Sequence, residues 1–178
     1  MTVRTLSCPI PENINPLSPN GYLFSIAKLP ELTFFCQEVT LPGISMVTIE
    51  QANPYVKIPQ PGEMLDFDPL QVQFLVDNKM SNYRAVYDWL YALGYPKDNA
   101  DAVDYAAANL GLATRMNETM FSDATLTILD NTNNPIQTVS FTDVFPSSIQ
   151  SLTFSSTNTD VQYLVGSATF SYTMYKFD

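Results

Sequence analysis

The sequence predicts a mainly β domain of the α+β class, with one principal helix and an antiparallel β-sandwich or barrel. Three observations lead to this prediction. Residues 161–177 alternate between apolar and hydroxyl-bearing side chains, as one long strand with one buried face would. Several shorter segments show the same two-residue period and are separated by turn-forming residues. One segment, 83–93, has clear helical periodicity.

Length and composition favour one domain with an arm in front of it. A chain of 178 residues can bury a substantial core. Residues 1–20 are rich in proline and asparagine, so we expect an extended arm there and a single domain over residues 21–178. Charged residues make up 15% of the chain, below the ~25% typical of soluble domains. This low charge favours surfaces that meet other subunits.

The first β-hairpin is predicted from two alternating segments. Residues 21–28 and 32–40 both carry aromatic side chains in a strand-like pattern, and residues 29–31 form a short turn between them. Residues 41–43, Leu-Pro-Gly, then end the second strand at a sharp corner, because proline fixes φ and glycine accepts unusual backbone angles.

Residues 44–68 are predicted to form an extended hairpin that protrudes from the main sheet. The segment contains Pro59 and Pro61, and short strands are expected near residues 46–50 and 55–58. An excursion of this length from a compact domain usually has a functional or interactive role.

A strand over residues 70–77 is followed by the principal helix. Asn82 is a suitable N-cap for a helix over residues 83–93, and Gly94 and Pro96 would end it. The expected apolar stripe consists of Tyr83, Val86, Tyr87, Leu90 and either Tyr91 or Leu93, with Trp89 close to it.

A variable insert precedes another hairpin. The insert covers residues 97–121, with a short alanine-rich helix over residues 101–112 and a loop over residues 114–121. Residues 122–130 and 136–145 then alternate on either side of an Asn/Pro-rich turn, which predicts a β-hairpin.

The chain is predicted to end in two strands, over residues 148–155 and 161–177, joined by a turn at residues 158–160. Gly166 is the expected bend in the long final strand. Its aromatic side chains are interpreted as core and subunit packing and not as base stacking, because few basic residues accompany them. The expected buried face carries Leu164, Gly166, Ala168, Phe170, Tyr172 and Met174. The hydroxyl-rich face carries Val165, Ser167, Thr169, Ser171, Thr173 and Tyr175.

Composition argues against several kinds of chemistry. The chain has no histidine, the usual general base and the commonest metal ligand. Its formal net charge of −10 opposes tight binding of nucleic acid, which requires clustered Lys and Arg. Cys8 and Cys36 lack zinc spacing; they allow a disulfide, but two reduced thiols are favoured, with Cys36 packed as a small apolar side chain. We therefore expect no catalytic residue, no metal and no cofactor.

Two weak motifs stand against this expectation. Glu63, Asp66 and Asp68 could form a metal site or an acid–base pair, but a solvated acidic loop is favoured because no third ligand pattern accompanies them. Ser25 and Lys28 match S-x-x-K, but positions three apart on a strand point to opposite faces. No secretory leader opens the sequence and no apolar run is long enough to span a membrane, so no membrane insertion is expected.

The order of several short motifs resembles the tail-tube proteins of contractile-tailed bacteriophages. The motifs are the strand and corner of residues 20–45, with Thr-Phe-Phe-Cys at 33–36, and the segment 61–78. They continue with the Asp88-Trp89 pair, Phe145-Pro146 and the terminal FSYTMYKF. The likeness covers residues 20–95 and 122–177, whereas the insert and the proline-rich arm depart from the family pattern.

The resemblance implies a structural, non-enzymatic subunit of a hexameric ring in the tail of a virion, assembled in the host cytoplasm. Stacked rings would form a tube that DNA crosses without tight binding, and sheath and baseplate proteins would be partners. A ring also pairs strand edges that would otherwise attract other chains. Inter-ring stacking is assigned to Met46, Thr48, Glu50, Tyr55, Lys57 and Ile58. The inter-subunit sheet edge is assigned to Val165, Ser167, Thr169, Ser171 and Thr173.

Other functions stay open at this stage. The chain could be a tube initiator or baseplate-hub protein, a neck adaptor that forms one ring, or the tube subunit of a related injection machine. A hydrolase acting on glycans through Asp66 and Asp68, and a glycan- or receptor-binding β domain with a Tyr- and Trp-lined groove, are less favoured.

Overall fold

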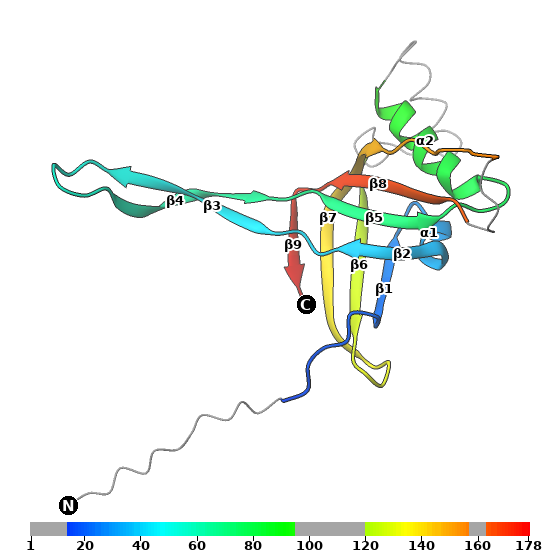
Figure 1. The fold of residues 1–178 in the computed structure, drawn as a ribbon, viewed down its shortest axis with the longest axis horizontal. Helices are drawn as coiled ribbons and strands as arrows, with labels where there is room; N and C mark the ends of the chain where they lie inside the picture. The colour runs from blue at the N-terminus through cyan, green and yellow to red at the C-terminus, as the bar shows by residue number, and fades with distance from the viewer. Residues whose placement is uncertain (1–13, 95–119, 157–162) are drawn as a thin grey trace, which may run out of the picture.

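The computed structural model describes residues 14–94, 120–156 and 163–178 (Figure 1). Three predictions therefore lie outside the described residues: most of the arm, the helix and nearly all of the loop in the insert, and the turn at residues 158–160. The described part of the arm, residues 14–20, contains no helix or strand.

Two antiparallel sheets that share one strand form the body of the domain. The strands are hydrogen-bonded in the order β1-β6-β7-β8-β5-β2, and β9 pairs with β7. Figure 1 shows β1, β6, β7 and β9 running across β8, β5 and β2. The bounds are β1 Tyr22–Ile26, β2 Cys36–Thr40, β5 Leu70–Leu75, β6 Ser122–Leu129, β7 Pro135–Ile149, β8 Val165–Ser171 and β9 Met174–Phe177.

Strand β7 connects the two sheets. Its first part pairs with β6 and β9, and its last part, from Phe145 onward, pairs with β8. Asp143, between the two parts, has a left-handed φ of 57°, which is uncommon for a residue other than glycine. One strand of 15 residues thus turns from one sheet into the other.

The core lies between the sheets and is covered by two helices, α1 (Pro30–Phe35) and α2 (Ser81–Gly94). Helix α2 packs on β7, and the buried Trp89 ring lies 6.4 Å from the Phe170 ring. Leu32 of α1 is fully buried. The largest buried side chains are Trp89, Phe24, Phe74, Phe141, Phe170, Ile26, Leu32, Leu70, Val72, Val86, Val139 and Val144.

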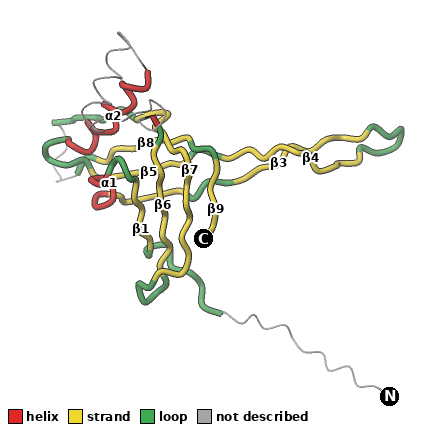
Figure 2. Tube along the Cα trace, turned by 180° about the vertical axis from the view of Figure 1, so that it is seen from behind, coloured by secondary structure: helices red, strands yellow, loops and turns green. Residues whose placement is uncertain are grey.

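A separate two-stranded sheet extends away from this core. It consists of β3 (Ile44–Gln51) and β4 (Ile58–Phe67), which pair with each other. Both views show the β3–β4 hairpin projecting far from the other elements (Figures 1 and 2). The predicted protruding hairpin is therefore confirmed, but the strand expected near residues 55–58 is misplaced, because residues 55–57 lie in the turn and β4 begins at Ile58.

Several other predictions are confirmed. Leu70, Val72 and Phe74 of β5 are buried and alternate with exposed glutamines. Strands β6 and β7 form the predicted hairpin. In its turn the Asp130 carboxylate accepts hydrogen bonds from the backbone N–H groups of Thr132 (2.7 Å) and Asn134 (2.9 Å).

The predicted hairpin of residues 21–40 is wrong. Strands β1 and β2 lie at opposite ends of the strand order, paired with β6 and β5 respectively. Between them, residues 30–35 are helical, with Pro30 in the first turn, where proline needs no hydrogen-bond partner. Burial of Leu32 against the core compensates for the weak helix propensity of the two phenylalanines.

The single long strand of residues 161–177 is also wrong. The chain breaks at Tyr172 and Thr173 into β8 and β9, because both strands follow β7 as it turns. Gly166 is not the bend; it lies in a regular ladder, where a Cβ would approach the Phe74 ring to 3.0 Å. The separate strand predicted over residues 148–155 is wrong as well. Strand β7 continues past Pro146 to Ile149 across a bulge, and no strand occupies residues 150–155.

Helix α2 begins before the predicted start. It includes Ser81 and Asn82, and Asn82 does not act as the N-cap. The Asn82 side chain is buried; it donates to the Leu75 carbonyl (2.7 Å) and accepts from the Asp77 N–H (3.2 Å), which ties the helix to the end of β5. The buried face of α2 consists of Asn82, Val86, Trp89 and Ala92. It is displaced by about one residue from the predicted stripe, and Tyr87, which was expected on that stripe, is exposed.

The half-buried Lys28 should make the free energy of unfolding depend on pH. Burial lowers its pKa from 10.5 to about 8, and its Nζ lies 5.0 Å from the centre of the Trp89 ring. Between these two pH values the unfolded chain holds a proton that the folded chain has lost, so Lys28 should make the unfolding free energy rise with pH relative to a variant that lacks this amine. The raised pKa values of Cys36 and Tyr172 act in the opposite direction, but equally in both proteins. The rise should be about 1–2 kcal/mol, because solvent screens part of the shift.

The measurement is urea unfolding between pH 7 and 10.5, followed by the fluorescence of the single tryptophan. Lys28→Met is the control and should lack this rise. Equal pH dependence in the two proteins would contradict the prediction.

Candidate assembly surfaces

The β3–β4 hairpin exposes many large apolar side chains to solvent. All eight residues of β3 are exposed, and so are most of β4. Met64 is 70% exposed, and Tyr55 in the turn is 92% exposed. The exposed large apolar residues of the hairpin are Ile44, Met46, Val47, Ile49, Tyr55, Val56, Ile58, Met64 and Leu65. An exposed apolar surface of this extent marks a contact with another protein or a membrane surface.

A bulge in β4 shapes the hairpin. Met46 pairs with Leu65, but Thr48 pairs with Pro61, so β4 carries extra residues between these two rungs. A Cβ at Gly62 would lie 2.1 Å from the Val47 carbonyl oxygen. Only glycine fits this close approach of the two backbones.

The six residues assigned to inter-ring stacking all lie in this hairpin. Four of them are in the strands, whereas Tyr55 and Lys57 are in the turn between them. The Lys57 Nζ lies 2.7 Å from the Glu50 carboxylate, and both side chains are largely exposed. The hairpin thus brings the six residues onto one projecting element. Their role in stacking stays a prediction.

The base of the hairpin is fixed by two tyrosines. The Tyr172 hydroxyl donates to the Asp68 carbonyl (2.8 Å), and the Tyr175 hydroxyl donates to the Pro42 carbonyl (3.1 Å). Phe67 packs against both rings, with centroids 6.1 and 5.7 Å away. We call Phe67, Tyr172 and Tyr175 the aromatic clamp, because they hold both strands of the hairpin where these leave the body.

Burial raises the pKa of Tyr172 to about 12, with smaller contributions from Tyr175 and Asp68. Its hydroxyl therefore stays protonated, and able to donate, at any physiological pH. The interpretation of the terminal aromatics as packing residues did not include these hydroxyl contacts, and nothing in the local sequence indicates them.

The outward face of β5 and β8 is polar and uncharged except at the end away from the hairpin, where Leu75 pairs with Val165. Gln71 and Gln73 are exposed on β5, and Ser167 and Thr169 pair beside them on β8. We call Gln71, Gln73, Ser167, Thr169 and Ser171 the amide–hydroxyl face.

Strand β8 is not a free sheet edge. It pairs with β5 on one side and with β7 on the other. The backbone of β8 is therefore not the inter-subunit edge to which Val165, Ser167, Thr169 and Ser171 are assigned. Thr173, the fifth residue of that assignment, lies in the break after β8, where its N–H donates to the Thr142 carbonyl. A contact through the side chains of these residues stays a prediction.

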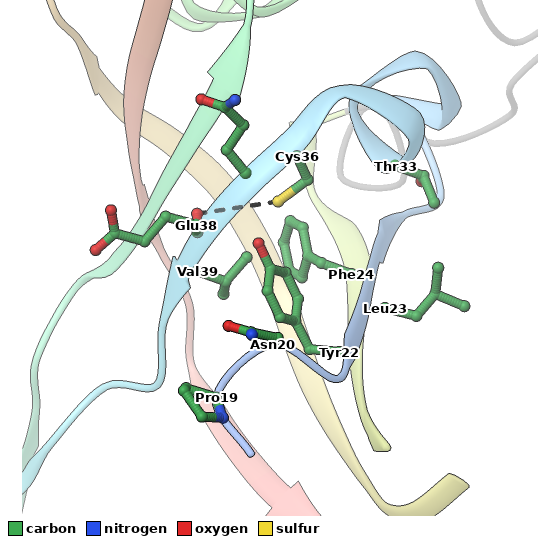
Figure 3. Close-up of a pocket in the computed structure, with 10 residues that line it drawn as sticks. Pro19, Asn20, Tyr22, Leu23, Phe24, Thr33, Cys36, Glu38 and Val39 are labelled. Carbon is green, nitrogen blue, oxygen red and sulfur yellow. Dashed lines mark hydrogen bonds between the residues drawn. The ribbon is translucent and has the colours of Figure 1, made fainter. Parts of the chain in front are cut away.

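The barrel is not closed, because β1 and β2 do not pair. A cleft of about 520 Å³ separates them, with Tyr22 and Phe24 on one side and Cys36 and Val39 on the other (Figure 3). The Cys36 Sγ points to the Glu38 carbonyl, 3.9 Å away, and burial raises the pKa of this thiol to about 11. Cys36 is free and packs against the core, as expected for that residue, while Cys8 lies outside the described residues.

The residues that the structure describes do not assemble a metal-ligand cluster. Within them, no group of three or more Cys, Asp or Glu could hold a metal ion. The Ser25 hydroxyl hydrogen-bonds with that of Thr125 (2.7 Å) across β1 and β6. No helix in the described part of the chain is long and apolar enough to cross a membrane.

Comparison with known proteins identifies the family. A family model described as "Phage tail tube protein" matches residues 15–178. The chain belongs to this family. The resemblance predicted from the motif order is therefore confirmed, and the family has a structural role in phage tails.

Among relatives of this chain, the tail tube terminator protein of Enterobacteria phage T4 is 26% identical over 155 residues, which cover 82% of this chain and 78% of that protein. The tube-terminating cap of the anti-feeding prophage has a TM-score of 0.63 at 13% identity, covering 100% of this chain and 99% of the cap. The sheath/tube terminator of the extracellular contractile injection system PVC has a TM-score of 0.57 at 17% identity, covering 92% and 97%. At these identities the two structures share the fold.

Gly62→Ala tests the hairpin geometry. The new methyl group would force the bulge open, so the amides of residues 44–67 should exchange with deuterium at least about tenfold faster. The melting temperature should change little, because the hairpin contributes no residue to the buried core.

Gly94→Ala is the matched control, since no described atom lies within 4 Å of its Cβ position. Unchanged exchange in the hairpin of Gly62→Ala would show that the close approach to Val47 does not constrain it.

Proposed function

We propose that this member of the phage tail tube protein family is a ring-forming structural subunit and that its β3–β4 hairpin joins its ring to the next ring of the tube. The exposed apolar hairpin is the observation that carries the proposal. A two-stranded hairpin is at best marginally stable alone in water. The aromatic clamp holds it out from the body, and a neighbouring ring would bury the apolar side chains that the body leaves exposed.

Unpaired strand edges support ring formation. In the described chain, β2 pairs only with β5, and the Phe145–Ile149 part of β7 pairs only with β8. The sheet β2-β5-β8-β7 therefore has an open edge on each side, and an edge-to-edge contact between copies can close into a ring. Six copies per ring is the number implied by the family.

The amide–hydroxyl face is suited to line the lumen of such a ring. It carries no formal charge, while the chain as a whole has a net charge of −10. A lumen of this kind offers DNA hydrogen-bonding groups without the clustered cations that bind phosphate tightly. We propose that DNA crosses it without stable binding, and that sheath and baseplate proteins contact the outside of the tube.

A second position in the tail is favoured by a specific observation. The T4 relative is named a tail tube terminator, and the cap and terminator structures share this fold. In that position the chain would form one ring at the end of the tube, and its hairpin would contact the last ring of a different tube protein.

Negative-stain microscopy of the purified protein tests the first proposal. Rings and stacked tubes are expected at high concentration. Deleting residues 47–60 should leave a folded protein that forms rings but no longer stacks, because the deletion removes most of the hairpin and none of the buried core. Tubes assembled from the deletion variant would contradict the role of the hairpin, and monomers at every concentration would contradict ring formation.

The same micrographs separate the two positions in the tail. A tube subunit should assemble without a template, whereas a terminator should remain as single rings at every concentration.

A further inference from the structure

The hairpin and an apolar groove lie at opposite ends of one sheet. Strands β2 and β5 meet the hairpin at Thr40 and Leu70, and β8 reaches that end with Ser171. At the other end, where β2 begins and β5 finishes, a groove of about 650 Å³ is open to solvent. We call it the terminal groove; its apolar lining includes Phe35, Leu75, Val76, Met80, Phe154 and Leu164. In Figure 1 the hairpin extends to the left and these strand ends lie on the right.

The groove has the chemistry of a docking site. Phe154 and Tyr163, which line it, are 69% and 77% exposed, although large aromatic side chains are usually buried. Aromatic residues that line a pocket are typical anchors of protein interfaces.

The tip of the hairpin, like the groove, exposes apolar and aromatic side chains. Tyr55 and Val56 are 92% and 64% exposed at the turn. Neither surface has a net formal charge: the tip holds the Lys57–Glu50 ion pair, and the groove region holds Asp77 and the exposed Lys79. Contact between two such surfaces avoids the general repulsion expected between copies with a net charge of −10.

We infer that the terminal groove is the receptor for the hairpin tip of a second copy in the adjacent ring. The inference rests on the proposed stacking of rings and adds the site to which the hairpin binds. A projecting element at one end of the subunit and its receptor at the other make a head-to-tail contact. A contact of this type repeats without limit along one axis, as the stacking of rings into a tube requires.

Cross-linking between copies tests the contact. In a Cys8→Ser/Cys36→Ser background, Val56→Cys is combined with Asn78→Cys, an exposed residue of the groove. A short bismaleimide added to assembled protein should produce a ladder of covalent multimers on denaturing gels. The matched control combines Val56→Cys with Ile136→Cys, which is also exposed but lies on β7 near the β6–β7 turn, and should give no ladder.

A second measurement covers variants that assemble poorly. Tyr55→Ala and Tyr163→Ala change exposed side chains and should each raise the concentration at which light scattering detects stacking, by roughly five- to thirtyfold. If the two side chains meet, the double variant should lose less than the product of the single effects.

The outcomes distinguish this inference from the proposed function. Rings that stack, with no ladder from Val56→Cys/Asn78→Cys or with independent effects of the two tyrosines, would overturn the groove as receptor and leave stacking intact. If the wild-type protein forms no rings or its rings do not stack, the proposed function fails, and the inference fails with it.

Discussion

The direction of the β3–β4 hairpin depends on two hydrogen bonds from tyrosine hydroxyls to backbone carbonyls. Tyr172 holds Asp68 and Tyr175 holds Pro42, so each strand of the hairpin is tied at its base. These tyrosines lie around the break between β8 and β9, which exists because β7 turns from one sheet into the other. The turn of β7, the break and the hairpin therefore form one structural unit. A hydrogen bond contributes only about 1 kcal/mol, but packing of Phe67 against both rings adds to it.

The residues that stabilise the fold are different from the residues that the hairpin exposes. The buried core consists of residues from the two sheets and the helices, and the hairpin supplies none of them. Its apolar side chains are therefore free to serve a contact outside the subunit. Gly62 and the bulge give the hairpin its shape, and the clamp gives it a fixed base, so little conformational entropy remains to be lost on docking. A pre-organised projection suits the proposed contact between stacked rings.

Local sequence patterns predicted the features that depend on residues close together in the chain. The buried faces of β5, β6 and β8 follow a two-residue period, and the long proline-containing excursion indicated a protruding hairpin. Contacts between distant residues decided the rest. Residues 32–35 alternate like a strand, yet burial of Leu32 and Pro30 in the first turn make them helical. The partners of the clamp tyrosines lie 104 and 133 residues away, so no local pattern could indicate them. Neither could the pairing of β8 on both sides, which moves the open edges to β2 and to the end of β7.

The most direct measurement is hydroxyl-radical footprinting of the hairpin in isolated and in assembled protein. Met46, Tyr55 and Met64 are exposed in the single subunit and react readily with the radical. Burial of the hairpin between rings predicts that their modification falls strongly on assembly, while Ile136 near the β6–β7 turn, which is 58% exposed, serves as an internal reference. Unchanged modification of all three residues in assembled protein would contradict the assignment of the hairpin as the element that joins one ring to the next.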